Sequence, residues 1–266
     1  MLGIFNKELV NAPKELNSPP PPMEGSAKRV IHKPKQVAPQ ECLKGFLSAH
    51  SNAFSLSFAN NGAALAFAPP AHPYPNHRCR LFSGVDDIYC SFLGSLNNLS
   101  SLNKQYGLSK CGNEAVFVIE AYKTLRDRGP YPVHQVLKDL EGSFGFVLYD
   151  TKANTVFVSL SGDGGVKLFW GIASDGSVMI SDNLDLIKAS CAKSFAPFPT
   201  GCMYHSEGGL MSFEHPTNKL MAMPRVDSEG FLCGSNFKVD VYSKTKSSMP
   251  RVGSEANWAA VWGQEA

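Results

Sequence analysis

Hydrophobic and polar positions alternate in several short stretches of the chain, a pattern typical of strands with one buried face. Residues 54–58 and 63–67 alternate in this way, and Asn60-Asn61-Gly62 between them is a turn sequence, so we predict a β-hairpin. Turn residues at 150–154 and 161–165 predict two more antiparallel hairpins among the strands that follow. The other predicted strands are 85–94, 144–149, 155–160, 167–171, 178–181, 201–205 and 209–213.

A helical period replaces this alternation in the middle of the chain. Residues 114–125 predict a buried helix that Gly129-Pro130 ends, and 133–140 and 183–189 predict two shorter helices. The apolar face of the first helix comprises Ala115, Phe117, Val118, Ala121, Tyr122 and Leu125. Short strands with a helical pair between them favour an α+β fold, namely a four-layer αββα sandwich with helices outside two sheets, although periodicity alone also fits other α+β folds.

The chain is long enough for one large domain. It has 266 residues, of which 43% are hydrophobic, and we assign residues 1–225 to the domain. After Val226 the pattern weakens, so residues 226–266 are predicted to be a partly flexible C-terminal extension. Proline-rich loops are expected near 17–40 and 68–80. Pro19 to Pro22 fits a stiff surface connection, with docking to an aromatic-lined groove as the alternative.

Composition excludes several classes of function. The formal net charge is +2 and the 25 Lys and Arg are scattered, so we expect no nucleic acid as partner. No apolar run approaches the roughly 20 residues of a membrane span, and the N-terminus lacks the apolar stretch of a signal peptide. We therefore expect a cytoplasmic protein, with the nucleus and the periphery of the plasma membrane as further locations. Seven cysteines without metal-ligand spacing indicate reduced thiols, no metal and no cofactor.

Two family resemblances emerge along the chain. The opening Met1-Leu2-Gly3-Ile4-Phe5 resembles that of class II glutamine amidotransferases such as the glutaminase domain of asparagine synthetase, which reads Met-Cys-Gly-Ile. Further ordered matches to that domain lie at 93–98, 140–150, 162–171 and 180–188. Nearly the whole chain resembles the plant family of aluminium-induced or stem-specific proteins, which is named for YGL and LRDR motifs. Here the motifs read Tyr106-Gly107-Leu108 and Leu125-Arg126-Asp127-Arg128. The resemblance implies an amidotransferase-like fold and no assigned reaction.

The amidotransferase resemblance implies a site, and its nucleophile is missing. In N-terminal nucleophile hydrolases the first residue of the mature chain provides the nucleophile and an α-amine as base. Leu2 occupies this position and has no reactive group. Because removal of the initiator methionine generally requires a small second residue, we expect Met1 to remain. The oxyanion-hole pair Asn-Gly becomes Leu93-Gly94, which keeps the glycine amide and loses the side-chain donor.

The groups that would hold the substrate in that family have alternative counterparts in this chain. The arginine that would bind the substrate carboxylate falls near Ala64, with Arg78 and Arg80 as alternatives. The acidic residue corresponds to Glu114, which also fits a helix N-terminus favoured by the macrodipole. A degenerate site composed of Leu2, Leu93, Gly94 and Glu114 is therefore expected.

Three other motifs have alternative interpretations. Ser161-Gly162-Asp163-Gly164-Gly165 fits a hairpin turn better than a phosphate loop, because it lacks the GxxxxGK[ST] pattern. Arg126, Asp127 and Arg128 fit structural ion pairing better than a recognition patch. Tyr106-Gly107-Leu108 precedes the buried helix, where glycine permits a tight turn.

From these features we predict a non-catalytic protein, a pseudoenzyme of the amidotransferase fold. The resemblance implies a role in plant stress, aluminium or hormone responses through self-association, a protein partner or a small amino-acid-like ligand. A homodimer is expected from the resemblance and from apolar edge strands. The alternative is an amide hydrolase activated by N-terminal processing, for example at Cys42, although cleavage there would discard the strand at the N-terminus.

Overall fold

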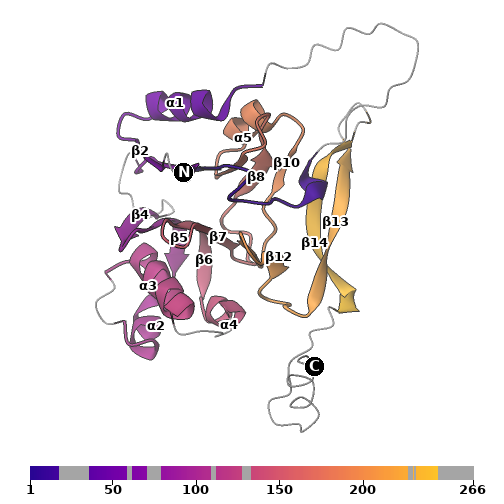
Figure 1. Ribbon diagram of the computed structural model, residues 1–266. Helices are drawn as coiled ribbons and strands as arrows, with labels where there is room; N and C mark the ends of the chain where they lie inside the picture. Colours follow the sequence, from indigo (N-terminus) through magenta and orange to yellow (C-terminus); the bar gives the residue numbers. More distant parts are fainter. Residues whose placement is uncertain are drawn as a thin grey trace, which may run out of the picture.

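Two stacked β-sheets with helices on their outer faces form the protein (Figure 1). The computed structural model describes residues 1–17, 36–58, 62–70, 79–108, 112–127, 133–226, 230 and 232–244. The sheet that we call the β1 sheet has the strand order β10-β8-β9-β1-β3-β2. Its strands are β1 (Leu2–Phe5), β2 (Phe54–Phe58), β3 (Ala63–Phe67), β8 (Phe169–Ile172), β9 (Val178–Ser181) and β10 (Phe195–Pro197).

The second sheet, called the β6 sheet, has the order β12-β11-β7-β6-β5-β4. Its strands are β4 (Arg80–Val85), β5 (Ile88–Leu96), β6 (Gly142–Asp150), β7 (Thr155–Leu160), β11 (Cys202–His205) and β12 (Gly209–Ser212). All described pairings between neighbouring strands are antiparallel.

Helices cover both outer faces, so the four-layer αββα prediction is confirmed (Figure 1). The β1 sheet packs against α1 (Pro39–Ala49) and α5 (Leu184–Cys191). The β6 sheet is covered by α2 (Leu99–Gln105), α3 (Glu114–Asp127) and α4 (Val133–Lys138). The largest apolar cluster lies between the sheets and includes Phe5, Leu93 and Trp170. Three apolar layers therefore hold the four structural layers together.

Several predicted elements are present. The hairpin at 54–58 and 63–67 is β2 and β3, with Leu56 opposite Leu65. The helix predicted at 114–125 is α3, and its predicted face packs on the β6 sheet. Regular alternation and a 3.6-residue period identified these elements, although β3 buries both faces, with Leu65 between the sheets and Ala66 on the opposite face.

Two predictions were wrong. The strand predicted at 85–94 was given the wrong start: it begins at Ile88 as β5, and the residues before it form a hairpin turn with β4 at Asp86 and Asp87, which have φ of 50° and 66°. This is the positive-φ pair that a two-residue hairpin needs. The loop at 161–165 is not a hairpin turn: β7 belongs to the β6 sheet and β8 to the β1 sheet, so the loop carries the chain from one sheet to the other.

A third, two-stranded sheet was not predicted. It comprises β13 (Asn218–Val226) and β14 (Leu232–Lys244). Leu220 on β13 and Phe237 on β14 pack against the cluster between the main sheets. The hairpin lies beside β10, β12 and the short 3₁₀ helix Lys14–Leu16. The predicted C-terminal extension therefore contributes β14 to the packed structure.

Some predictions fall on residues outside the described ranges: Pro19 to Pro22, Arg78, Arg128, Gly129-Pro130 and the end of the extension after residue 244. Among the described helices, none has the length and apolar character needed to cross a bilayer.

Candidate functional site

Leu2 belongs to the core beneath α1 and α5. β1 lies between β3 and β9, and Leu2 is opposite Ala66 and Ser181. Its side chain is 1% exposed and packs in the cluster that includes Phe46 and Ile187. Since side chains alternate along a strand, Leu2 points away from the space between the sheets. The residue at the nucleophile position is thus a packing residue.

Met1 and Leu93 occupy the space between the two sheets. Met1 is 2% exposed and Leu93 is 4% exposed, and both belong to the cluster between the sheets. The place where the sequence suggests an oxyanion hole therefore carries apolar side chains, and the loss of the side-chain donor at Leu93 is accompanied by close packing.

The α-ammonium of Met1 forms an ion cluster with Asp182 and Arg80. It donates to Oδ1 of Asp182 at 2.6 Å, while the Arg80 guanidinium donates to Oδ2. The Ser181 hydroxyl donates to the Met1 carbonyl at 2.7 Å. Burial lowers the pKa of the Met1 α-ammonium, and the charge of Asp182 opposes this effect. The α-amine is therefore held by a carboxylate of the same chain.

Arg80, one of the predicted alternatives to Ala64, lies in this cluster, whereas Arg78 is outside the described residues. Ala64, the first alternative, is on β3 opposite Ile4 and has no charge. Arg80 begins β4 on the β6 sheet, whereas Asp182 follows β9 on the β1 sheet. The ion pair therefore connects the two sheets. Asp182 lies in the segment 180–188 that resembles the amidotransferase domain, but we did not predict a role for it at the site.

Gly94 has its amide in a main-chain hydrogen bond. Its N–H donates to the Cys79 carbonyl at 2.8 Å. The glycine φ is 98°, and a Cβ here would collide with the Ser143 carbonyl. This position therefore requires glycine for conformation and close approach, and the amide that the sequence offered as an oxyanion donor already has a partner.

Glu114 is the first residue of α3, as the helix interpretation predicted. The Oδ1 atom of Asn113 accepts from the Val116 N–H at 2.9 Å, which caps this end. A carboxylate here is favoured by the helix dipole. Burial and, to a smaller extent, the charge of Glu114 raise the pKa of the Cys79 thiol.

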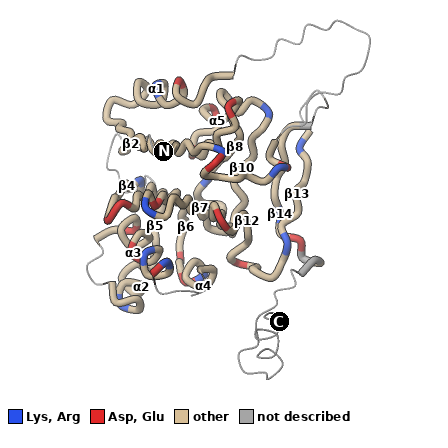
Figure 2. Tube along the Cα trace, viewed as in Figure 1, with Lys and Arg blue, Asp and Glu red and all other residues tan. Residues whose placement is uncertain are grey.

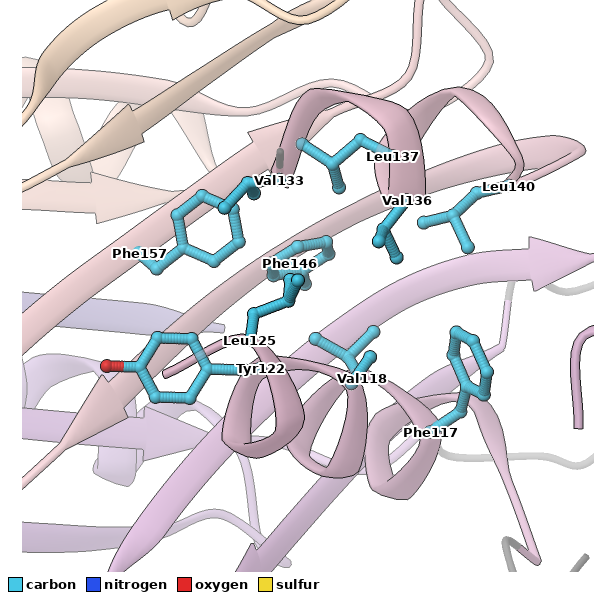
Figure 3. A pocket seen from close by; sticks show the side chains of 11 residues that line it. Phe117, Val118, Tyr122, Leu125, Val133, Val136, Leu137, Leu140, Phe146 and Phe157 are labelled. Carbon is cyan, nitrogen blue, oxygen red and sulfur yellow. The ribbon is translucent and has the colours of Figure 1, made fainter. Parts of the chain in front are cut away.

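The LRDR motif forms the ion pairs that the sequence predicted. Arg126 donates to Asp150 at 2.6 Å and to Asp127 at 2.8 Å. Asp150 is fully buried, and its other oxygen accepts from the Lys152 and Ala153 N–H groups. Arg126 thus compensates a buried charge where β6 ends. Leu125 faces the apolar layer under α3 (Figure 3).

The YGL motif ends α2. Gly107 has φ of 67°, and the Leu108 N–H donates to the Asn103 carbonyl at 2.7 Å. This is the hydrogen bond of a Schellman C-cap, where a left-handed residue is needed. The Tyr106 hydroxyl donates to Asp139 at 2.8 Å and thereby ties α2 to the end of α4. The motif has a structural role, in agreement with the turn interpretation.

Asp163 stabilises the loop that crosses between the sheets. Its carboxylate accepts from the hydroxyls of Ser143 and Ser161 and from the Gly165 N–H. Burial alone would raise the pKa of Asp163, but these hydrogen bonds outweigh burial and lower it. A carboxylate at the centre of the loop is incompatible with phosphate binding there.

A small cavity lies between α3, α4 and the β6 sheet (Figure 3). Its volume is about 20 Å³ and its walls are apolar, with Phe146 and Phe157 at its base. This is room for about one water molecule and too little for an amino acid. Charged residues are distributed over the described part of the trace (Figure 2), and within the described ranges no group of His, Cys, Asp and Glu is arranged to hold a metal ion.

Known proteins resemble this chain to different extents. The stem-specific protein TSJT1 of Nicotiana tabacum is 37% identical over 163 residues, which cover 60% of this chain and 99% of that protein. A probable glutamine-hydrolysing asparagine synthetase of Dictyostelium discoideum is 38% identical over 30% of this chain and 14% of its own. Asparagine synthetase 1 of Arabidopsis thaliana is 30% identical over 42% of this chain and 19% of its own.

Among solved structures, the glutamine phosphoribosylpyrophosphate amidotransferase of B. subtilis aligns with a TM-score of 0.41 and 17% identity. The alignment covers 59% of this chain and 36% of that one. The family model described as aluminium-induced protein matches residues 2–239. The chain therefore belongs to the aluminium-induced protein family.

Proposed function

We propose that this protein acts by binding and does not hydrolyse glutamine. The observation that carries the proposal is the N-terminal strand: the Leu2 side chain is 1% exposed under α1 and α5, and the α-amine is bound to Asp182. Amide hydrolysis by an N-terminal nucleophile requires a reactive side chain and an available α-amine on the same residue. This chain offers neither at Leu2.

The surroundings of the strand support the same proposal. Leu93 is apolar and packed, and the Gly94 N–H donates to Cys79. Loss of one oxyanion-hole donor costs roughly 3 kcal/mol of transition-state stabilisation in other hydrolases. A thiol at position 2 alone would therefore lack its partner groups.

The biological role that we propose is in plant stress, aluminium or hormone responses, in the cytoplasm and also in the nucleus or at the plasma membrane. The family description and the stem-specific relative support this setting. The mode of action that we propose is association with itself, with a protein partner or with a small amino-acid-like ligand, and the cavity in Figure 3, which holds about one water molecule, is too small to be the site of such a ligand.

Activation by cleavage at Cys42 has little support. Cys42 lies on α1, is 4% exposed and packs in the same cluster as Leu2. Cleavage before Cys42 would interrupt α1 and remove β1 from between β3 and β9. The enzyme alternative would therefore require loss of a central strand.

A glutaminase assay tests the proposal. Wild type, Leu2→Cys and Leu2→Cys/Leu93→Asn are compared with an active asparagine synthetase under identical conditions, and intact mass establishes the N-terminus of each. We expect no release of glutamate above buffer from wild type or Leu2→Cys. The double variant shows whether a second restored group matters. Glutamine turnover by the wild-type protein would refute the proposal.

A further inference from the structure

The two lateral sides of the sandwich differ in what lies beside their outer strands. On one side the β13 and β14 hairpin lies beside the outer strands β10 and β12 (Figure 1). On the other side the outer strands are β2 and β4. In the described part of the chain, β3 is the only strand that pairs with β2. One edge of β2 therefore has main-chain donors and acceptors without a described strand partner.

β2 has no charge, no proline and no bulge to protect its edge. Its sequence, Phe54-Ser55-Leu56-Ser57-Phe58, contains no charged residue and no proline (Figure 2). Natural edge strands are commonly blunted by lysine, proline or a bulge, because an unprotected edge pairs with other strands. Phe54 is 41% exposed although its ring lies 5.1 Å from Phe82 and 5.8 Å from Phe67. The edge of the core between the sheets is thus open at this position.

We propose that β2 pairs antiparallel with β2 of a second copy of this chain, about a twofold axis at Leu56. The sequence of the strand reads the same in both directions, so this register gives five cross-strand pairs. Phe54 of one copy faces Phe58 of the second, Ser55 faces Ser57, and Leu56 faces its own equivalent. Because the strand is uncharged, self-pairing brings no like charges together.

The direction of the side chains agrees with this register. Phe58 packs on Tyr149 with ring centroids 5.1 Å apart, so Phe54, Leu56 and Phe58 share the face toward the β6 sheet. Pairing about Leu56 keeps these residues on one face in both copies and buries Phe54. Ser55 and Ser57 lie on the opposite face. This inference specifies the self-association in the proposed function, and it does not depend on the proposed lack of glutamine hydrolysis.

Two double variants on the serine face test the register. In S55K/S57K, both Ser55–Ser57 cross-strand pairs would set lysine against lysine, whereas in S55K/S57E each lysine would face a glutamate. Within one copy, both variants place charges at the same two positions, half-buried Ser55 and exposed Ser57. We expect a dimer for wild type and S55K/S57E by light scattering, and a dissociation constant at least tenfold higher for S55K/S57K. Circular dichroism and urea midpoints verify that both variants are folded.

Three outcomes would overturn the proposal. A monomeric wild type at its highest soluble concentration removes the dimer. Dimers of equal strength for both double variants place the interface elsewhere. A monomeric but folded S55K/S57E, beside a dimeric wild type, excludes this register.

Discussion

The α-ammonium of Met1 lies 2.6 Å from Oδ1 of Asp182, a residue 181 positions away in the chain. Asp182 also accepts from Arg80, so one carboxylate balances two cations, one from each main sheet. The Met1 side chain is 1% exposed and that of Asp182 is 13% exposed. Electrostatic interactions are strong at such burial, and the cluster connects the first strand to the end of β9.

Asp182→Asn is expected to destabilise the fold by about 3 kcal/mol, because it leaves the buried α-ammonium without its counter-charge. The urea midpoint measures the loss. Asp185→Asn, an exposed position in the first turn of α5, is the matched control and is expected to leave the midpoint almost unchanged. Equal midpoints for the two variants would contradict a structural role of the cluster.

Arg126→Ala is expected to cost about 3 kcal/mol, because fully buried Asp150 would lose its charged partner. Urea unfolding provides the measurement. Lys123 lies on the same helix as Arg126 and forms an ion pair with exposed Asp86. Lys123→Ala removes this pair and is expected to change the stability little. In Arg126→Ala/Asp150→Asn the buried charge itself is absent, so part of the lost stability should return. A double variant less stable than Arg126→Ala would argue against charge compensation.

Gly→Ala substitutions at two positions are expected to change the stability of the fold in opposite directions. Gly107 has φ of 67° at the end of α2, so alanine there should cost about 1 kcal/mol through backbone strain alone, since a Cβ would meet open space. Gly45 lies inside α1 and also has open space around its Cβ position, so alanine there should stabilise by up to about 1 kcal/mol. Midpoints that shift in the same direction would show that conformation is not the cause.

The pH dependence of stability is expected to have a maximum near pH 8. Burial lowers the folded-state pKa of His134, His205 and the Met1 α-ammonium. A basic group with a lowered pKa binds fewer protons in the folded state, so its contribution is present above its unfolded pKa and is lost as pH falls. The rise in stability due to the two histidines ends near pH 7, because the ordinary pKa of histidine is 6.5. The rise due to the α-amine continues toward its ordinary pKa of 8.0.

Above pH 9 stability is expected to fall with rising pH, because burial raises the folded-state pKa of Cys191 and Cys202 to about 12 and also raises that of Cys90. Unfolded thiols lose protons that folded thiols keep, so stability falls. Urea midpoints between pH 5 and pH 10 test the profile. Cys90→Ala should show a shallower decline at high pH, and an unchanged slope in this variant would contradict the thiol assignment.

The sequence predicted the elements whose signal is local. The β2 and β3 hairpin and α3 could be identified because alternation or helical period appears within a few residues. The turn at Asp86 and Asp87 was missed because it contains no glycine, although aspartate tolerates positive φ. The loop at 161–165 has ordinary turn chemistry, and local sequence does not reveal that its two strands belong to different sheets.

Contacts between distant residues at the candidate site were even harder to predict from the sequence. Leu2 and Leu93 identified a missing nucleophile and a missing donor, but the pairing of Met1 with Asp182 depends on the strand order β9-β1-β3. The engagement of the Gly94 amide depends on where Cys79 enters β4. Both require the sheet topology, which a single sequence does not specify.

The hairpin of β13 and β14 has a consequence for how far assembly proceeds. A sheet that is open at both lateral sides would add copies at either end and grow into a filament. Here the hairpin lies beside β10 and β12 at one side of both sheets, and the proposed pairing uses the opposite side. Strand pairing about a twofold axis uses that side in each copy, and assembly then stops at two.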